Sequence, residues 1–505
     1  PAIFAWCLFN ETWGFGGQTS FLEKLLPPAP GQTRDTSPPK QSTVPMPPPQ
    51  RWVQSMWELA KSLDPTRLVE DMSVCHWDHL QYYQHCDTDI NSWHFYINDY
   101  EKARAHIEKI VGSTFVGSSF NYVPGFIHKG QPLINSEFGG IGALDGDRDV
   151  SWSFKFLVNE LRRHQQIAAY IYTELHDVEW EYNGFLNYDR TPKQFGYDPA
   201  LINESNTLPV DAPPVQRLAP GSRVSIPVFS SHYSSRPHKN VTLHWNLGGI
   251  DTKGGLHQHL AAGRSPIAFP HRRVAPACTI EFTLPEIPML CTLLIDARAE
   301  DGAILAQNFV QFLASNEYPP EREKSARSLV LRGSPANWSE AGWSGGGGER
   351  EKERAEDCCF GFGHGFFEWS LPLDGADLSR ARRIKVLCEA SSHRIDSPQT
   401  DDDIFPTTLR ISLNDTPLQE SRLRNHPHDA RGVLSYLRGG VGAYGYLIYA
   451  VAEGEHLEKV RRNANDHALR FRCAVPAEAL AQGGLTIYGA ECGRFPLCPT
   501  VILEW

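Results

Sequence analysis

The first 200 residues alternate between short apolar segments and longer segments in which apolar positions recur with the period of a helix. Short continuous apolar runs are typical of strands buried on both faces, and the longer periodic segments are typical of amphipathic helices. The predicted strands are residues 3–9, 68–71, 90–96, 133–136 and 168–173, and the predicted helices are residues 51–63, 100–111 and 152–166. Strands that alternate with helices indicate βα units, so we expect an α/β fold with a parallel sheet.

The pattern changes near residue 200. Short alternating segments are then separated by Pro and Gly turns, and no long helix is predicted. About 110 residues of this kind have the size of an immunoglobulin-like β-sandwich. Residues 325–505 are again rich in predicted strands and indicate a second β-sandwich, for which a jelly roll is one candidate. We therefore expect three domains, at residues 1–200, 201–316 and 325–505.

Two segments interrupt these patterns. Residues 27–50 are rich in Pro and polar residues, a composition that does not form a packed element. We interpret this segment as an extended insertion, with a lid over a functional site as the alternative. Residues 345–357 combine Gly with charged residues and are interpreted as a disordered loop.

Composition excludes several classes of function. The net charge of -11 argues against nucleic acid or an anionic membrane surface as the partner. The 11 cysteines are odd in number and show neither a disulfide framework nor the spacing of a zinc motif. The acidic residues 145–149 lack the distal Glu of a calcium loop, so we expect no metal site there. No apolar run approaches the length of a membrane span, and no dinucleotide or phosphate-binding motif follows a strand.

Two predicted strands end in a glutamate. Asn10 and Glu11 follow the first strand, and Glu137 follows the fourth. The carboxyl ends of the strands form the active face of an α/β barrel, so both carboxyl groups would face one site. A retaining glycosidase needs such a pair, about 5–5.5 Å apart. The alternative is that both glutamates lie on the rim without a role.

Several motifs in this region resemble glycoside hydrolase family 2, which includes β-galactosidases, β-mannosidases and β-glucuronidases. Residues 6–11 (WCLFNE) resemble its acid/base motif, and residues 63–69 resemble the segment that follows. Residues 132–139 are similar to the nucleophile strand, and residues 174–193 to the eighth strand and the barrel exit. The resemblance covers roughly residues 1–200, and it implies strands four to eight of a TIM barrel.

The resemblance also implies roles. Glu11 would be the general acid and then the general base, with a pKa raised by its partner's charge. Glu137 would be the ionised nucleophile. Asn10 would bind the sugar 2-hydroxyl. Tyr96 would hydrogen-bond to the nucleophile, with a place in the core as the alternative.

Four further residues are candidates for contacts with substrate. His94 lies on the same face as Tyr96 by the period of a strand, and it either touches substrate hydroxyls or is a core histidine. Trp13 and Trp93 are candidate sugar platforms, with a place in the core as the alternative. Glu174 stands where many relatives carry Trp, which leaves the identity of the sugar open.

The expected function is retaining hydrolysis of terminal β-linked sugars from an oligosaccharide or glycoconjugate, without a cofactor. A homo-oligomer is compatible with this expectation. The alternative is a carbohydrate-binding or scaffolding protein with a non-functional, incomplete barrel, because sandwich domains host many functions.

The start of the sequence, at Pro1 and within a predicted strand, indicates a fragment of a longer protein. Its compartment is therefore unknown, with the periplasm or secretion slightly favoured over the cytoplasm. A barrel without three of its strands leaves sheet edges unpaired, so we expect the chain expressed alone to be poorly soluble or inactive. Turnover of an aryl β-glycoside by the purified chain would contradict this expectation.

Overall fold

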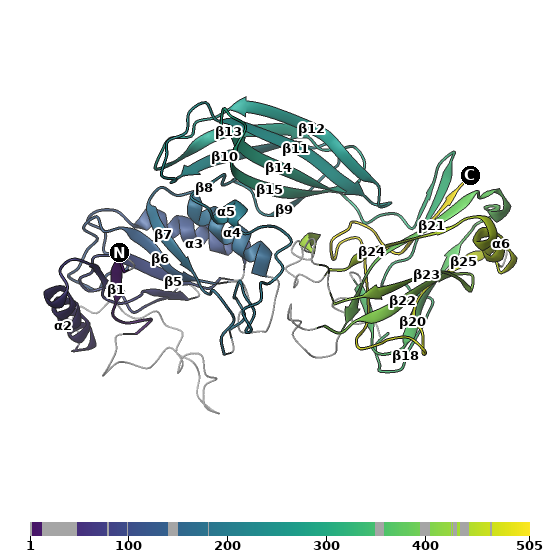
Figure 1. The fold of residues 1–505 in the computed structure, drawn as a ribbon, viewed down its shortest axis with the longest axis horizontal. Coiled ribbons are helices and arrows are strands. Elements are labelled where there is room, and N and C mark those ends of the chain that lie inside the picture. Colours follow the sequence, from purple (N-terminus) through teal and green to yellow (C-terminus); the bar gives the residue numbers. More distant parts are fainter. Residues whose placement is uncertain are drawn as a thin grey trace. The chain divides into compact units, whose positions relative to one another are not determined.

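The computed structural model describes residues 3–12, 48–77, 80–97, 99–139, 150–179, 181–348, 358–393, 404–425, 427, 432–434, 444–464 and 467–505 (Figure 1). The chain forms two compact units. The first unit comprises residues 1–143 and 156–185, and the second comprises residues 144–155 and 186–505. The predictions for Trp13, for most of the Pro-rich segment, for residues 145–149 and for residues 349–357 lie outside the described residues.

The first unit is built on parallel strands in sequence order. β1 (Ala5–Cys7) pairs with β2 (Leu68–Glu70), and a second sheet joins β3 (Cys75–Trp77), β5 (Asn91–Phe95), β6 (Leu133–Phe138) and β7 (Ile167–Tyr172). β4 (Leu80–Tyr82) is antiparallel to β3. Residues 68–77 connect β1 to β5 through backbone hydrogen bonds. The N–H of Ser73 donates to Phe9 O at 3.0 Å, and the N–H of His94 donates to Val74 O at 2.7 Å. The predicted parallel α/β fold is confirmed, and the described strands form no closed barrel.

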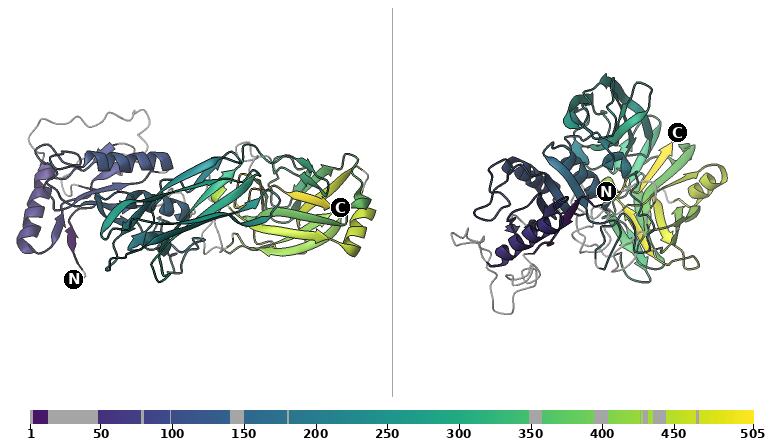
Figure 2. Two further views of the ribbon diagram at one scale, coloured as in Figure 1. Left: turned by 90° about the horizontal axis from the view of Figure 1, so that it is seen from above. Right: turned by 60° about the vertical axis from the view of Figure 1, so that its left-hand side comes forward.

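The three predicted helices are α2 (Pro48–Leu63), α3 (Tyr100–Ser113) and α4 (Val150–Arg162). Asp99 caps α3, because its carboxylate accepts the backbone N–H of Lys102 at 2.8 Å. The helix lies along the parallel sheet (Figures 1 and 2), with His106 against Phe95 of β5 at 5.2 Å between ring centres. This packing holds β5 in place behind the strand ends that carry the candidate site.

The first strand is more exposed than the sequence predicted. Ile3, Phe4 and Trp6 are 45%, 61% and 42% exposed, although the apolar run predicted a strand buried on both faces. Among the described residues β1 pairs with β2 alone, so its other side has no neighbour. Ile171 of β7, at the far edge of the five-stranded sheet, is 51% exposed. Both edges thus present apolar side chains to solvent, a feature that favours self-association.

The second unit contains two β-sandwiches. In the first, a three-stranded sheet of order β13-β10-β8 packs on a five-stranded sheet of order β12-β11-β14-β15-β9. All pairs are antiparallel except β15 with β9. The strands are β8 (Asn206–Thr207), β9 (Val215–Leu218), β10 (Arg223–His232), β11 (Thr242–Asp251), β12 (Leu256–Pro266), β13 (Arg273–Thr283), β14 (Met289–Arg298) and β15 (Ile304–Ala314). α5 (Ala200–Asn203) precedes them.

The C-terminal sandwich packs a seven-stranded sheet on a five-stranded sheet around Phe367, Trp369 and Phe471. The seven strands are β16 (Arg322–Lys324), β17 (Ser328–Arg332), β19 (Cys358–Gly361), β21 (Arg383–His393), β24 (Tyr446–Ala452), β26 (Gly484–Tyr488) and β27 (Thr500–Glu504). The five are β18 (Glu340–Trp343), β20 (Gly365–Pro372), β22 (Thr407–Leu413), β23 (Thr416–Leu423) and β25 (Ala468–Val475). A short 3-10 helix, η2 (Leu378–Arg380), and α6 (Gly454–Arg462) complete it. The predicted change to antiparallel sheets is confirmed.

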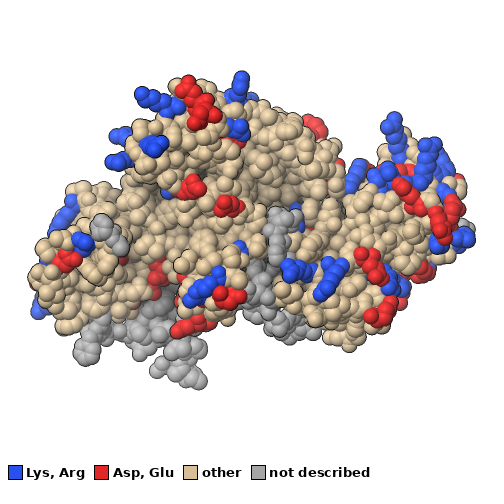
Figure 3. Space-filling model, in the orientation of Figure 1, with Lys and Arg blue, Asp and Glu red and all other residues tan. Residues whose placement is uncertain are grey.

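On the face shown in Figure 3, acidic and basic side chains are interspersed rather than separated into large regions of one charge. None of the described helices has the length and apolar character needed to cross a membrane.

Lys155 of α4 is buried in the second unit and makes stability depend on pH. Its ammonium group donates to Asn308 Oδ1 at 2.8 Å and lies 4.6 Å from the centre of the Phe309 ring. Burial lowers the pKa of Lys155 to about 7, from 10.5 in the unfolded chain. Between these values the unfolded state binds more protons, so stability rises with pH, by about 2 kcal/mol from pH 7 to 9.

Urea unfolding at pH 7 and pH 9 measures this effect. Lys155→Met lacks the titrating group and should lose the rise that the unchanged protein shows. An equal rise in both proteins would contradict the assignment to Lys155.

Candidate active site

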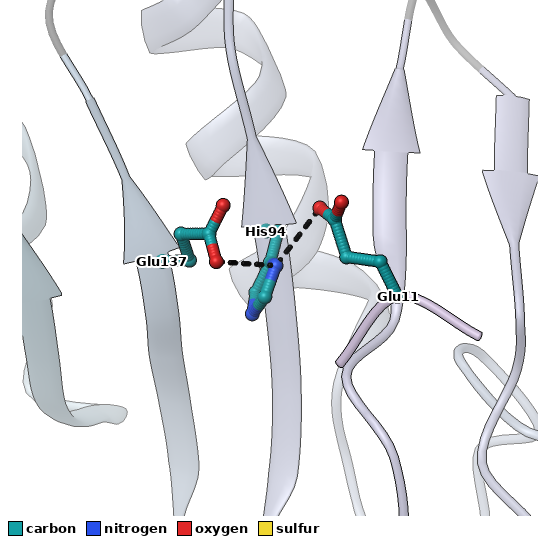
Figure 4. A group of neighbouring side chains, drawn as sticks. All are labelled: Glu11, His94 and Glu137. Carbon is teal, nitrogen blue, oxygen red and sulfur yellow. Dashed lines mark hydrogen bonds and ion pairs between the residues drawn. The ribbon is translucent and has the colours of Figure 1, made fainter. Parts of the chain in front are cut away.

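Three strand ends of the first unit bring Glu11, His94 and Glu137 together (Figure 4). Glu11 follows β1, His94 lies on β5, and Glu137 lies on β6 directly opposite His94 in the register of the two strands. Because the strands are parallel, their carboxyl ends meet at one edge, as the sequence predicted for the two glutamates. The backbone at Glu11 has a φ of 51°, a left-handed conformation that is uncommon for a residue with a long side chain.

The histidine lies between the two carboxylates. His94 Nδ1 is 3.0 Å from Glu11 Oε1 and 3.4 Å from Glu137 Oε2. One imidazole nitrogen and one carboxylate oxygen from each glutamate lie within 4.8 Å of one another. The side chain of His94 is 2% exposed, whereas those of Glu11 and Glu137 are 19% and 20% exposed. The carboxylates therefore face solvent while the imidazole supports them from behind.

A buried polar network holds these groups in place. The Tyr96 hydroxyl donates to Glu137 Oε1 at 2.6 Å. His94 Nε2 lies 2.9 Å from Ser136 Oγ, and Ser136 Oγ donates to Glu70 Oε1 at 3.2 Å. Glu70 is buried at the end of β2, where it also accepts a hydrogen bond from the hydroxyl of Ser92. Sequence reasoning missed Glu70 and Ser136, although the strand-end pattern that singled out Glu11 and Glu137 applies to Glu70 as well.

The pKa of Glu11 shifts opposite to the expected direction. Burial raises the pKa of Glu11, but the hydrogen bond and charge of His94, together with a hydrogen bond from Cys75, outweigh burial, and the pKa falls below its usual value. The pKa of Glu137 is raised, chiefly by burial and against the charge of His94, with the charge of Glu11 adding to the rise. The expectation of a raised pKa for Glu11 is therefore corrected. The physical reason is that His94 Nδ1 lies nearer to Glu11 than to Glu137.

The other predicted substrate contacts differ in their accessibility. Asn10 is exposed, and its Oδ1 accepts a hydrogen bond from Ser73 Oγ at 3.3 Å. Trp93 has no exposed surface, and a ring in that position offers no face to a sugar. Glu174 is partly buried and hydrogen-bonds with Glu181, whose pKa is raised by burial and by the charge of Glu137.

Gly139 shows how closely the segment after β6 is packed. A Cβ atom at this position would lie 2.5 Å from Asn183 Nδ2 and 2.7 Å from Tyr96 Cε1. Neither distance is compatible with a side chain, so glycine is required beside the Tyr96 ring. The close packing fixes the ring whose hydroxyl reaches Glu137.

Tyr96→Phe tests the network without any assay of activity. Loss of the hydroxyl removes a hydrogen bond to a carboxylate, worth about 1.5–3 kcal/mol, so the pKa of Glu137 should rise by about 1–2 units. Carbon-13 NMR titration of the glutamate carboxyl groups measures the change. Tyr172→Phe is the matched control, because the Tyr172 hydroxyl donates to Asn183 O at 2.8 Å rather than to Glu137. A Glu137 titration that is the same in both variants would contradict the role of Tyr96.

Comparisons with known proteins give only distant similarities. No protein-family model and no curated protein sequence matches the chain. A β-glucuronidase of Parabacteroides merdae matches over 89% of this chain and 46% of its own, with 11% identity and a TM-score of 0.30. An exo-chitosanase of Amycolatopsis orientalis matches over 67% of this chain and 34% of its own, with 10% identity and a TM-score of 0.23.

A family 123 glycoside hydrolase of Clostridium perfringens matches over 21% of this chain and 23% of its own, with 16% identity and a TM-score of 0.16. This chain thus spans less than half the length of each of these structures. TM-scores of this size carry no argument, so the functional case depends on the site itself.

Proposed function

We propose that this chain carries the catalytic carboxyl groups of a retaining β-glycosidase that resembles glycoside hydrolase family 2. The observation that carries the proposal is the meeting of Glu11 and Glu137 at adjoining strand ends, with carboxylate oxygens within 4.8 Å of one another. Retaining glycosidases hold their carboxyl groups about 5–5.5 Å apart, whereas inverting enzymes need about 6.5–9.5 Å to admit a water molecule. The spacing therefore favours retention.

In the first step, a Glu137 carboxylate oxygen attacks the anomeric carbon of a terminal β-linked sugar. The bond to the leaving oxygen breaks as Glu11 donates its proton to that oxygen, which gives an alcohol and a glycosyl ester of Glu137. In the second step, Glu11 accepts a proton from water as the water oxygen attacks the anomeric carbon. The sugar leaves with its configuration retained, and the carboxylate of Glu137 and the proton of Glu11 are restored.

Neighbouring side chains assist Glu137 as the nucleophile and Glu11 as the acid. Tyr96 donates a hydrogen bond to Glu137 and orients the attacking carboxylate. His94 lies within hydrogen-bond distance of Glu11, so a proton on Nδ1 is able to pass to Glu11 Oε1 across 3.0 Å. Exposed Asn10 beside Glu11 is available to a substrate hydroxyl.

Covalent trapping tests the proposal. The protein, expressed from its complete coding sequence, is incubated with 2-deoxy-2-fluoro glycosyl fluorides of the galacto, manno and glucurono series and then analysed by peptide mass spectrometry. The 2-fluoro group slows hydrolysis of the ester more than its formation, so a glycosyl adduct on Glu137 is expected with at least one reagent.

The unreactive Glu137→Gln variant is the control for labelling elsewhere. A folded protein that gives no adduct on Glu137 with any of the three reagents would overturn the proposal and favour a carbohydrate-binding role.

A further inference from the structure

The direction of the hydrogen bonds behind His94 fixes which ring nitrogen carries a hydrogen. Ser136 Oγ has one hydrogen, which it donates to Glu70 Oε1 at 3.2 Å. Ser136 therefore accepts from His94 Nε2 at 2.9 Å, and Nε2 bears the hydrogen. In the neutral imidazole, the lone pair is then on Nδ1 and faces the two glutamates.

Three electron-pair donors thus meet at one point. His94 Nδ1, Glu11 Oε1 and Glu137 Oε2 face one another at 3.0 Å and 3.4 Å from the nitrogen (Figure 4). Two carboxylates and a lone pair repel one another unless a positive charge lies among them. A proton on Nδ1 supplies one such charge, and a metal ion would supply another.

The spacing suits a small tetrahedral ion. Bonds of about 2.1 Å from zinc to nitrogen and oxygen place neighbouring tetrahedral ligands about 3.4 Å apart. The separation of 3.4 Å between His94 Nδ1 and Glu137 Oε2 agrees with this value, and the separation of 3.0 Å to Glu11 Oε1 requires a small opening. All three ligand atoms lie within 4.8 Å of one another, so modest rotations of the glutamate side chains complete the geometry.

The support behind the imidazole is of the kind that metal-binding histidines use. Such histidines donate the hydrogen of their other ring nitrogen to a polar group, which fixes the tautomer and the ring orientation. Here Ser136 Oγ accepts the hydrogen bond from His94 Nε2 and donates its own hydrogen to Oε1 of buried Glu70. The same Glu70 oxygen also accepts a hydrogen bond from the hydroxyl of Ser92. These hydrogen bonds behind the imidazole are independent of the distances among the three ligand atoms.

We propose that Glu11, His94 and Glu137 form a binding site for a divalent transition-metal ion of the Zn²⁺ type. One imidazole nitrogen and two carboxylate oxygens favour Zn²⁺ over Mg²⁺ and Ca²⁺, which prefer six or more oxygen ligands. The partial exposure of both glutamates leaves the fourth position to water. The ion uses the lone pairs of both carboxylates, so the metal-bound protein neither protonates a leaving group nor attacks a sugar.

This site differs from the sequence-based expectation, which assigned no metal ligand. Metal binding at these residues does not require the proposed glycosidase activity. Only the inhibition of glycosidase activity by the bound metal ion rests on the proposed function. The experiments below therefore reject the metal site and the glycosidase activity separately.

Calorimetric titration with Zn²⁺ tests binding directly. The full chain, freed of metal with a chelator, is expected to bind one Zn²⁺ at this site, with an affinity that a hundredfold excess of Mg²⁺ does not reduce. His94→Gln should weaken binding at least 100-fold, and Ser136→Ala should weaken it about 10–100-fold through the loss of support for the ring. Visible absorption of the Co²⁺-bound protein should show the intense bands of a tetrahedral ion.

His257→Gln is the matched control, because His257 Nε2 pairs with a single carboxylate oxygen, Asp251 Oδ2, at 2.8 Å in the second unit. This variant should keep the Zn²⁺ affinity of the unchanged protein. Circular dichroism verifies that each variant is folded, and the Co²⁺ spectrum of the unchanged protein gives a result that depends on no variant.

Absence of Zn²⁺ binding at millimolar concentration, an octahedral Co²⁺ spectrum, or binding unchanged in both His94→Gln and Ser136→Ala would overturn the proposal. If the trapping reaction on Glu137 occurs, Zn²⁺ should slow it in proportion to its occupancy, and a chelator should restore it. Trapping that fails while Zn²⁺ binds would reject the glycosidase and keep the metal site.

Discussion

Glu137→Gln is expected to lower the turnover of an aryl β-glycoside by about 1000-fold or more in the protein expressed from its complete coding sequence. The amide has nearly the shape of the carboxylate, and its oxygen still accepts the hydrogen bond that Tyr96 donates to Glu137 Oε1. It carries no charge and does not form the glycosyl ester. The loss therefore reports the nucleophile itself rather than a change of packing.

Leaving-group dependence separates Glu137 from Glu11. Glu11→Gln removes the acid, which typically costs about 100- to 10,000-fold, but this cost should shrink for a dinitrophenyl leaving group that needs no proton. The deficit of Glu137→Gln should not shrink. Glu179→Gln is the control, because Glu179 is exposed in the same unit and outside the three-residue cluster. A Glu137→Gln variant with a tenth of the normal rate would contradict the assignment.

Glu389→Gln is expected to destabilise the C-terminal sandwich by about 1–3 kcal/mol. Glu389 lies on β21 with no exposed surface, and both of its oxygens accept backbone N–H groups. Oε1 accepts from Gly445 at 2.7 Å and from Arg494 at 2.9 Å, and Oε2 accepts from Phe495 at 2.9 Å. The amide nitrogen of Gln would place hydrogens against these hydrogens, which leaves buried donors without acceptors.

Denaturant unfolding followed by the fluorescence of the sandwich tryptophans measures the effect. Glu420→Gln serves as the control in the same sandwich, because Glu420 is 51% exposed in its ion pair with Arg410 and should change stability by less than about 1 kcal/mol. Equal stabilities of the two variants would show that the backbone loop around Glu389 rearranges to accept the amide.

The elements that could be predicted from the sequence are those whose own residues show a clear apolar pattern. The parallel strands β1, β2, β5, β6 and β7, the helices α2 to α4 and about half of the described sandwich strands follow from the apolar pattern alone. β12 was missed because its sequence, LHQHLAAGRSP, has no apolar alternation and most of its residues lie toward solvent. α6 was missed because GEHLEKVRR is short and highly charged, with only Leu457 and Val460 buried.

Within the site, residue types were easier to predict than their electrostatics. The two glutamates follow from strand ends, and their approach follows from parallel topology. Whether Glu11 or Glu137 has the higher pKa depends on a difference of a few tenths of an ångström in their distances to His94, which no pattern in the sequence encodes. The burial of Trp93 likewise depends on packing between strands distant in sequence.

Because of the left-handed backbone at Glu11, the residue that is best for fold stability at this position differs from the residue that the proposed chemistry needs. A non-glycine residue with a φ of 51° costs about 1 kcal/mol or more, and Gly or Asn would relieve much of this cost. The variant that folds best at this position is thus one that has lost the carboxylate. Thermostability screens of libraries at position 11 would therefore enrich proteins that have lost the proposed acid, and any engineering of this chain should select for the carboxyl group and for folding together.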